Sequence, residues 1–214
     1  GRYFPILATC QGFQNMLVSM AGQNLTTLQG GFNNTNVNRS VIILEDEVPK
    51  TKLFSKMYTD DLKWFFQQGY AFYNHDYGIL QEHFMRNQKL VDQFFVVGLT
   101  KKLELSGRPF VTIMEHKKYP FIANLWHPEK NPNEKGQNFK RVDRSRKSIS
   151  ATRYILQSLV ESSQQHAVDY KKLPAFIEGF YAWSFPLLQT NYTGCDRIVY
   201  TRRTLLDSEL NSGN

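Results

Sequence analysis

The stretch YFPILATCQGFQNMLVSM, residues 3–20, joins a short apolar run to a helical pattern through a cysteine. Residues 3–9 are apolar except at their ends, which predicts a short buried strand. After Gly12 the apolar residues recur every three or four positions, which predicts a helix with one apolar face. These apolar residues are Phe13, Met16, Leu17 and Met20. Cys10 therefore lies at a predicted strand-to-helix turn.

The composition is that of a folded globular domain, since 41% of the 214 residues are hydrophobic and 21% are charged. The apolar runs are too short to span a bilayer. The net charge of +7 would suit an acidic partner. The Lys and Arg residues are scattered, however, and no nucleic-acid-binding motif accompanies them, so no nucleic acid partner is expected. We expect a single catalytic domain over residues 1–205 and a flexible tail over residues 206–214.

The remaining sequence alternates between strand and helix patterns, which predicts an α/β fold with helices on both faces of a sheet. Strands are predicted at residues 41–44, 109–115 and 121–126. Helices are expected to begin at Asp60, whose carboxylate favours a helix N-terminus, and at Ser150, which can act as a cap. Polar connections are predicted at residues 22–40 and 127–148.

A cysteine between a strand and a helix has the properties of a nucleophile. The helix N-terminus favours the thiolate, which is the attacking form of the side chain. Gly12 leaves room for a tight turn, and the backbone N–H of Gln11 would point toward the oxygen of a carbonyl under attack. The alternative is that Cys10 is a buried small hydrophobic residue.

The sequence NLWHPEK, residues 124–130, supplies a matching base. Pro128 forces His127 into extended backbone, where residues two apart project to the same side. Glu129 can then orient the imidazole of His127, giving a nucleophile, an acid–base group and an orienting carboxylate. A surface turn is the alternative for this short motif. No His, Cys and Asp cluster has metal-ligand spacing, so neither a metal nor a cofactor is expected.

Two sequence features bear on the compartment. The two cysteines, Cys10 and Cys195, allow one disulfide or a free nucleophile. Four Asn-x-Ser/Thr sequons are candidate glycosylation sites, which points to a secretory or lysosomal route. Their acceptors are Asn24, Asn33, Asn38 and Asn191.

The motifs TCQGFQ, residues 9–14, and WHPEK, residues 126–130, resemble those of the class I glutamine amidotransferase-like hydrolases, and more closely the γ-glutamyl hydrolases. Three further segments follow the same order and spacing, and the resemblance extends to about Tyr200. These segments are FYNHDYGI at 72–79, KKYPFIANLWHPEKNP at 117–132 and QTNYTG at 189–194. The resemblance implies a flavodoxin-like three-layer sandwich with a mostly parallel central sheet.

The resemblance also implies an activity, namely hydrolysis of γ-glutamyl amide bonds, as in folyl-poly-γ-glutamate, through a thioester at a cysteine. Cys10, His127 and Glu129 match the catalytic triad. A lysosomal, vacuolar or extracellular location goes with this family.

The same resemblance assigns three substrate-side positions. Gln11 matches the donor of an oxyanion-hole N–H, and Gln14 matches a position that contacts the glutamyl group. His75 resembles a second histidine on the substrate side, with a solvated loop histidine as the alternative.

The chain departs from the family in two respects. Ala8 replaces a glycine, and its methyl group is expected to crowd the turn. The first strands of the family domain, with a loop that supplies the second oxyanion donor, have no counterpart here. The chain thus resembles the carboxyl-terminal two-thirds of the domain, and we expect an amino-terminal segment in the same polypeptide.

Two other functions stay open. One is a glutaminase subunit that supplies ammonia to a synthase, and the other is a catalytically silent relative with a structural or binding role. A homodimer is also an alternative. The basic residues of the connection after Glu129 are expected either to attract a polyanionic substrate or to form a solvated surface. They are Lys130, Lys135, Lys140, Arg141, Arg144, Arg146 and Lys147.

Overall fold

The computed structural model describes residues 4–101, 107–134, 136, 139–164, 187–192 and 195–200. The chain forms two units, Gly1–His166 and Ala167–Asn214, which are described separately. In the second unit the backbone of β8 (Leu187–Tyr192) pairs antiparallel with β9 (Cys195–Tyr200). The predicted tail at residues 206–214 lies outside the described residues.

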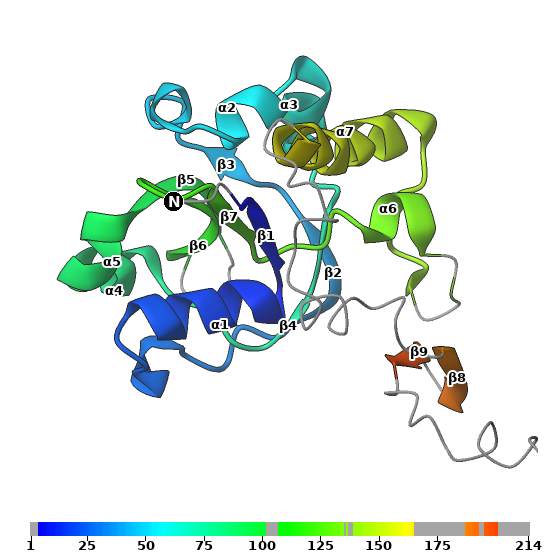
Figure 1. Ribbon diagram of the computed structural model, residues 1–214, viewed down its shortest axis with the longest axis horizontal. Coiled ribbons are helices and arrows are strands. Elements are labelled where there is room, and N and C mark those ends of the chain that lie inside the picture. Colours follow the sequence, from blue (N-terminus) through cyan, green and yellow to red (C-terminus); the bar gives the residue numbers. More distant parts are fainter. Residues whose placement is uncertain are drawn as a thin grey trace, which may run out of the picture. The chain divides into compact units, whose positions relative to one another are not determined.

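The first unit contains a five-stranded sheet with the order β1-β7-β6-β5-β3 (Figure 1). Its strands are β1 (Ile6–Thr9), β3 (Ile42–Ile43), β5 (Phe94–Lys101), β6 (Pro109–His116) and β7 (Phe121–Asn124). A separate two-stranded antiparallel sheet joins β2 (Asn34–Arg39) to β4 (Ala71–His75).

Within the described residues, the sheet is mixed, and the expectation of a mostly parallel sheet is wrong. β1 pairs parallel with β7, but the pairs β7–β6, β6–β5 and β5–β3 are antiparallel. The physical reason is the short connection at residues 117–120, which can join β6 to β7 only as a hairpin, because a parallel crossover needs a dozen or more residues.

Helices cover both faces of the five-stranded sheet, which confirms the predicted α/β sandwich. Figure 1 shows α1, α4 and α5 on one side and α2, α3 and α7 on the other. The α-helices are α1 (Gln11–Met20), α2 (Phe54–Met57), α3 (Asp60–Gln67), α4 (Gln81–Arg86), α5 (Gln88–Gln93), α6 (Lys130–Asn133) and α7 (Arg146–Gln164). Two short 3₁₀ helices are η1 (Leu25–Thr27) and η2 (Val48–Lys50).

Helix starts follow local capping chemistry. The predicted start at Asp60 is confirmed, since the Thr59 side chain accepts a hydrogen bond from the backbone N–H of Leu62. The predicted start at Ser150 is wrong, because α7 begins at Arg146. Ser145 provides the cap there: its Oγ accepts a hydrogen bond of 3.2 Å from the N–H of Ser148.

The segment 22–40, expected to be surface loop, contains η1 and the strand β2. The register of β2 with β4 shifts between Asn34 and Val37, and Asn36 within this irregular part has a positive φ of 53°. Asparagine tolerates this backbone region better than most residues, so an Asn-rich segment can form a bulged strand.

The core fixes the elements that carry the candidate site. Phe13 and Leu17 on the apolar face of α1 are fully buried, as their spacing predicts. Trp126 is also fully buried. The centre of its ring lies 5.5 Å from the ring centre of Phe65 and 5.3 Å from that of Phe66. Burial of a side chain of this size stabilises the fold by about 2 to 3 kcal/mol. Trp126 therefore anchors the segment that follows β7. No helix among the described residues has both the length and the apolar character needed to cross a bilayer.

Candidate active site

The parallel strands β1 and β7 bring two distant parts of the chain to one edge of the sheet. Thr9 pairs with Asn124, and the backbone N–H of Cys10 donates to the Asn124 carbonyl at 2.8 Å. Cys10 directly follows β1, and His127 follows β7 by three residues. The carboxyl ends of parallel strands in α/β sheets are the usual position of ligand sites.

Cys10 occupies a strained turn. Its φ of 52° and ψ of −104° are rare for a residue with a side chain, and α1 begins at the next residue. This is the backbone form expected of a nucleophile held between a strand and a helix. The methyl group of Ala8 does not crowd the turn: a Cβ built on Gly12 would lie 3.5 Å from Cβ of Ala8, which is ordinary van der Waals contact.

Strand β4 contacts both candidate catalytic residues through backbone carbonyls. The N–H of His127 donates to the carbonyl of Phe72 at 2.9 Å. The Sγ of Cys10 lies 3.8 Å from the carbonyl oxygen of Asn74, to which the thiol donates. Phe72 and Asn74 are two residues apart, so the same edge of β4 serves both contacts.

His127 and Glu129 form a direct pair across Pro128, as predicted, but the backbone between them is a turn and not extended: Glu129 has αR backbone, and the N–H of Lys130 donates to the carbonyl of His127 at 3.4 Å. The Nδ1 of His127 lies 2.6 Å from Oε1 of Glu129. The side chain of His127 is 14% exposed and that of Glu129 is 43% exposed. The second carboxylate oxygen, Oε2, is buried and has no hydrogen-bond partner among the described residues.

The surroundings of His127 favour its protonated form. Burial alone would lower the pKa of the ring, but interactions with Cys10 and then Glu129 outweigh burial and raise this pKa to about 9. Burial likewise would raise the pKa of Glu129, whereas its bond to His127 lowers it below the usual value. The pair therefore carries opposite charges at neutral pH.

The sulfur of Cys10 is near enough to His127 to influence the pKa of the ring, but Nε2 makes no hydrogen bond of standard geometry with a described residue. Nε2 is buried, and the thiol is directed to Asn74 instead. Within the part of the chain that the structure describes, Nε2 of His127 thus has no hydrogen-bond partner.

Two of the three predicted substrate-side residues meet at Tyr77. The side-chain amide of Gln14 donates to the carbonyl oxygen of Tyr77 at 2.9 Å, and Nδ1 of His75 lies 2.9 Å from the same atom. Since a carbonyl only accepts, Nδ1 of His75 carries the proton. The amide Nδ2 of Asn34 then donates to its Nε2 at 3.4 Å.

His75 is buried in β4 with 6% exposure, so the alternative of a solvated loop histidine is wrong. Gln11, in contrast, is exposed at the first position of α1. Its backbone N–H belongs to the first helical turn, whose N–H groups have no acceptor within the helix.

The candidate glycosylation sites differ in accessibility. Asn24 and Asn33 are exposed, and Oδ1 of Asn24 accepts hydrogen bonds from the backbone N–H and the hydroxyl of Thr26. The amide nitrogen of Asn38 is engaged, because it donates to the carbonyl of Arg141. Asn191 lies in β8, of which the structure describes the backbone alone.

Several basic residues after Glu129 interact within the chain. Lys130 lies 3.5 Å from a carboxylate oxygen of Glu134 and 4.0 Å from the centre of the Phe139 ring. Arg144 donates to the carbonyls of Glu134 and Phe139, and Lys147 lies 3.6 Å from Asp61. Lys135 lies outside the described residues. Attraction of a polyanion by this segment stays a prediction.

Sequence patterns do not indicate the backbone acceptors at this site. The carbonyls of Asn74 and Tyr77 contact Cys10, Gln14 and His75, but every residue has a carbonyl, so composition gives no signal. The resemblance of residues 72–79 to a family segment indicated that this stretch matters without indicating how.

Three known proteins that are similar to this chain in sequence are named γ-glutamyl hydrolases. The chain is 34% identical over 139 residues to γ-glutamyl hydrolase B of Dictyostelium discoideum, covering 62% of this chain and 37% of that protein. It is 28% identical over 165 residues to probable γ-glutamyl hydrolase 3 of Arabidopsis thaliana, covering 77% and 45%. It is 25% identical over 174 residues to γ-glutamyl hydrolase of Mus musculus, covering 81% and 52%.

No protein-family model matches the chain. Among solved structures, the glutaminase domain of Trypanosoma brucei CTPS has a TM-score of 0.41 and 14% identity, covering 72% of this chain and 60% of that domain. This likeness is too weak to support a fold or a function. The chain spans about half or less of the length of the curated relatives above. The relatives nevertheless support the resemblance to the γ-glutamyl hydrolases, to which the chain is similar in sequence over 62 to 81% of its length.

Proposed function

We propose that the protein containing this chain hydrolyses γ-glutamyl amide bonds, with Cys10 as nucleophile, His127 as general acid and base, and Glu129 as the orienting carboxylate. One observation carries the proposal: Cys10 and His127 follow neighbouring parallel strands, while Glu129 holds Nδ1 of His127 at 2.6 Å. Sequence similarity to γ-glutamyl hydrolases supports the choice of bond.

In the first half of the reaction, the Cys10 thiol gives its proton to solvent, and the resulting thiolate turns away from the Asn74 carbonyl and attacks the γ-carbonyl carbon of the substrate. A C–S bond forms and the carbonyl oxygen becomes an oxyanion. The protonated imidazole of His127, with its raised pKa, then gives the Nε2 proton to the amide nitrogen, the C–N bond breaks, and the amine leaves. The product of this half is a thioester on Cys10.

In the second half, neutral His127 removes a proton from water through Nε2, and the hydroxide adds to the thioester carbonyl. Collapse of this second oxyanion breaks the C–S bond, returns Cys10 to the thiolate and releases the γ-carboxylic acid of glutamate, which ionises to the carboxylate. The proton on His127 restores the starting ion pair with Glu129. Each bond formed is matched by one broken, and no oxidant or metal takes part in the scheme.

The N-terminus of α1 suits stabilisation of the oxyanion. The backbone N–H of Gln11 is at the first helical position, next to the nucleophile, where the helix dipole favours negative charge. Loss of one such donor costs about a hundred- to a thousandfold in rate. Gln14 and His75, which share the Tyr77 carbonyl, are placed on the substrate side of Cys10 in this scheme.

The substrate class that follows is a poly-γ-glutamate chain, with folyl-poly-γ-glutamate as the example that the family resemblance implies. The proposed reaction acts on a small molecule and requires neither a nucleic acid nor a membrane partner. A lysosomal or secreted location fits the two exposed sequon asparagines, Asn24 and Asn33, which are accessible to glycosylation enzymes.

The test is a turnover assay of the full-length protein with γ-linked glutamyl peptides, compared with α-linked peptides of the same composition. Release of glutamate from the γ-linked peptides alone, lost in Cys10→Ala, is the expected result. Turnover that survives Cys10→Ala, or equal cleavage of both linkages, would refute the proposal. Hydrolysis of free glutamine without cleavage of γ-glutamyl peptides would favour the glutaminase alternative.

A further inference from the structure

A cavity lies away from Cys10, near the start of β7, whereas the candidate active site lies beyond the end of this strand. Its volume is about 340 Å³, which is within the range of small-molecule sites. It is lined by the start of β5, by α4 and by the turn between β6 and β7. Lys117 in this turn precedes β7, whereas His127 follows β7, so the two sites lie at opposite ends of this strand.

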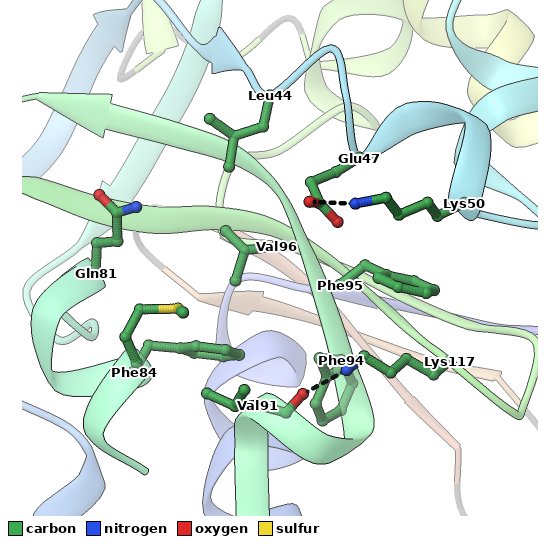
Figure 2. A pocket seen from close by; sticks show the side chains of 11 residues that line it. Leu44, Glu47, Lys50, Gln81, Phe84, Val91, Phe94, Phe95, Val96 and Lys117 are labelled. Atoms are coloured by element: carbon green, nitrogen blue, oxygen red, sulfur yellow. Dashed lines mark hydrogen bonds and ion pairs between the residues drawn. The ribbon is translucent and has the colours of Figure 1, made fainter. Parts of the chain in front are cut away.

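The interior of this cavity is apolar. Figure 2 shows Leu44, Phe84 and Val96 around the central space, contributed by the residue after β3, by α4 and by β5. Phe84 is buried, while Val96 and Leu44 are half-buried, so the apolar surface is partly open to solvent. A ligand with an apolar body would remove this surface from water, which is favourable.

The polar groups of the cavity are few and are placed on two sides. Figure 2 shows Lys50 and Lys117 on one side and Gln81 on the opposite side. Lys50 is neutralised by Glu47, whose carboxylate lies 2.7 Å from its ammonium nitrogen. Lys117 has no carboxylate within ion-pair distance among the described residues, so the lining carries one uncompensated positive charge.

The ammonium group of Lys117 is held in a defined position. Its Nζ donates to the carbonyl of Val91 at 2.7 Å and lies 5.3 Å from the centre of the Phe95 ring. An ammonium group has three N–H donors, so two stay available beside the apolar lining. A carboxylate accepts such donors in charge-assisted hydrogen bonds, and the ordered ammonium lowers the entropy cost of forming them.

We propose that this cavity is a binding site for a small amphipathic carboxylate, with the acid group at Lys117 and an aromatic or branched apolar body against Val96 and Phe84. The inference is independent of the proposed catalytic function, because it uses none of the residues around Cys10.

The test uses 2-naphthoate as the probe, 2-naphthamide as its neutral counterpart, and the full chain alkylated at Cys10 so that the catalytic site does not contribute. Calorimetry or ligand-observed NMR gives the two dissociation constants. We expect the acid to bind about twofold to fivefold more tightly than the amide, the size expected of one partly exposed charge pair. Lys117→Gln should abolish this difference, while the adjacent Lys118→Gln, outside the cavity lining, should preserve it.

A second variant tests the apolar part of the site without changing any charge. Val96→Phe places a larger side chain in the middle of the cavity and should remove binding of both probes, with circular dichroism used to verify that the variant folds. The proposal would be overturned if acid and amide bind equally to the parent chain, or if neither shows saturable binding. It would also be overturned if Lys117→Gln and Lys118→Gln reduce the difference in affinity by the same amount.

Discussion

Gln14 and His75 hydrogen-bond to one oxygen atom, the carbonyl of Tyr77, from two different elements, helix α1 and strand β4. The helix that starts at the candidate nucleophile is thereby tied to the segment that follows β4. The two contacts are of equal length but differ in burial, since His75 is buried and Gln14 is half-buried.

This difference predicts unequal costs of removing the two side chains. His75→Ala should lower the free energy of unfolding by about 2 to 4 kcal/mol, because it removes a buried ring and leaves the Asn34 amide without its acceptor. Gln14→Ala, the matched control on the same acceptor, should cost about 1 kcal/mol or less. Urea denaturation measures both, and equal losses would contradict the assignment of His75 to the core.

Cys10 should be the reactive thiol of the chain. In the full-length protein, Cys10→Ala should abolish turnover while thermal unfolding stays close to that of the parent. Iodoacetamide should alkylate Cys10 faster than Cys195, because the proposed mechanism makes Cys10 the attacking nucleophile. Peptide mass spectrometry distinguishes the two cysteines. Similar alkylation rates, together with activity in Cys10→Ala, would rule out this assignment.

The raised pKa of His127 predicts a pH dependence of stability. The folded-state pKa of about 9 exceeds the unfolded value near 6.5, so the protonated ring stabilises the folded state fully below about pH 6.5. This contribution should decrease from about pH 7 and be lost as the pH rises through 9. Unfolding free energies from pH 6 to 10 should show the decrease in the parent and a smaller one in His127→Gln. Parallel curves for the two proteins would contradict the raised pKa.

Glu129 should matter less for catalysis than His127. Glu129→Gln keeps an oxygen near Nδ1 but removes the charge, so the pKa of His127 should fall and the rate should decrease by about ten- to a hundredfold, less than for His127→Ala. The pH–rate profile separates this effect from a general loss of structure. The alkaline limb of the profile should move to lower pH in Glu129→Gln, whereas a general loss of structure would lower the rate without moving the limb. A carboxylate found directed away from the ring in a ligand-bound structure would contradict the role.

The sequence permits prediction of those elements whose signal is local. The helix with Phe13 and Leu17 follows from the spacing of its apolar residues, and the helix start at Asp60 follows from capping chemistry. The pairing of His127 with Glu129 is also as predicted, although it forms across a turn and not in the extended backbone that was expected.

The missed features depend on contacts between distant segments. Strand β2 has the polar sequence NTNVNR, and it becomes a strand because β4 provides hydrogen bonds about 40 residues further on. The antiparallel pairing of β3 with β5 likewise joins segments that are far apart in the sequence, such as Ile42 and Leu99. The carbonyl of Asn74 beside Cys10 has no side-chain signature at all.

The positive φ of Cys10 places catalysis and stability in competition at a single position. A residue with a side chain in this backbone region costs the folded state about 1 to 3 kcal/mol, whereas glycine adopts it without that cost. Cys10→Gly should therefore unfold at a higher temperature than Cys10→Ala, although both lack the thiol. An equal or lower melting temperature for the glycine variant would show that the turn is unstrained. If the order is as expected, the folded chain gives up part of its own stability to present one sulfur atom.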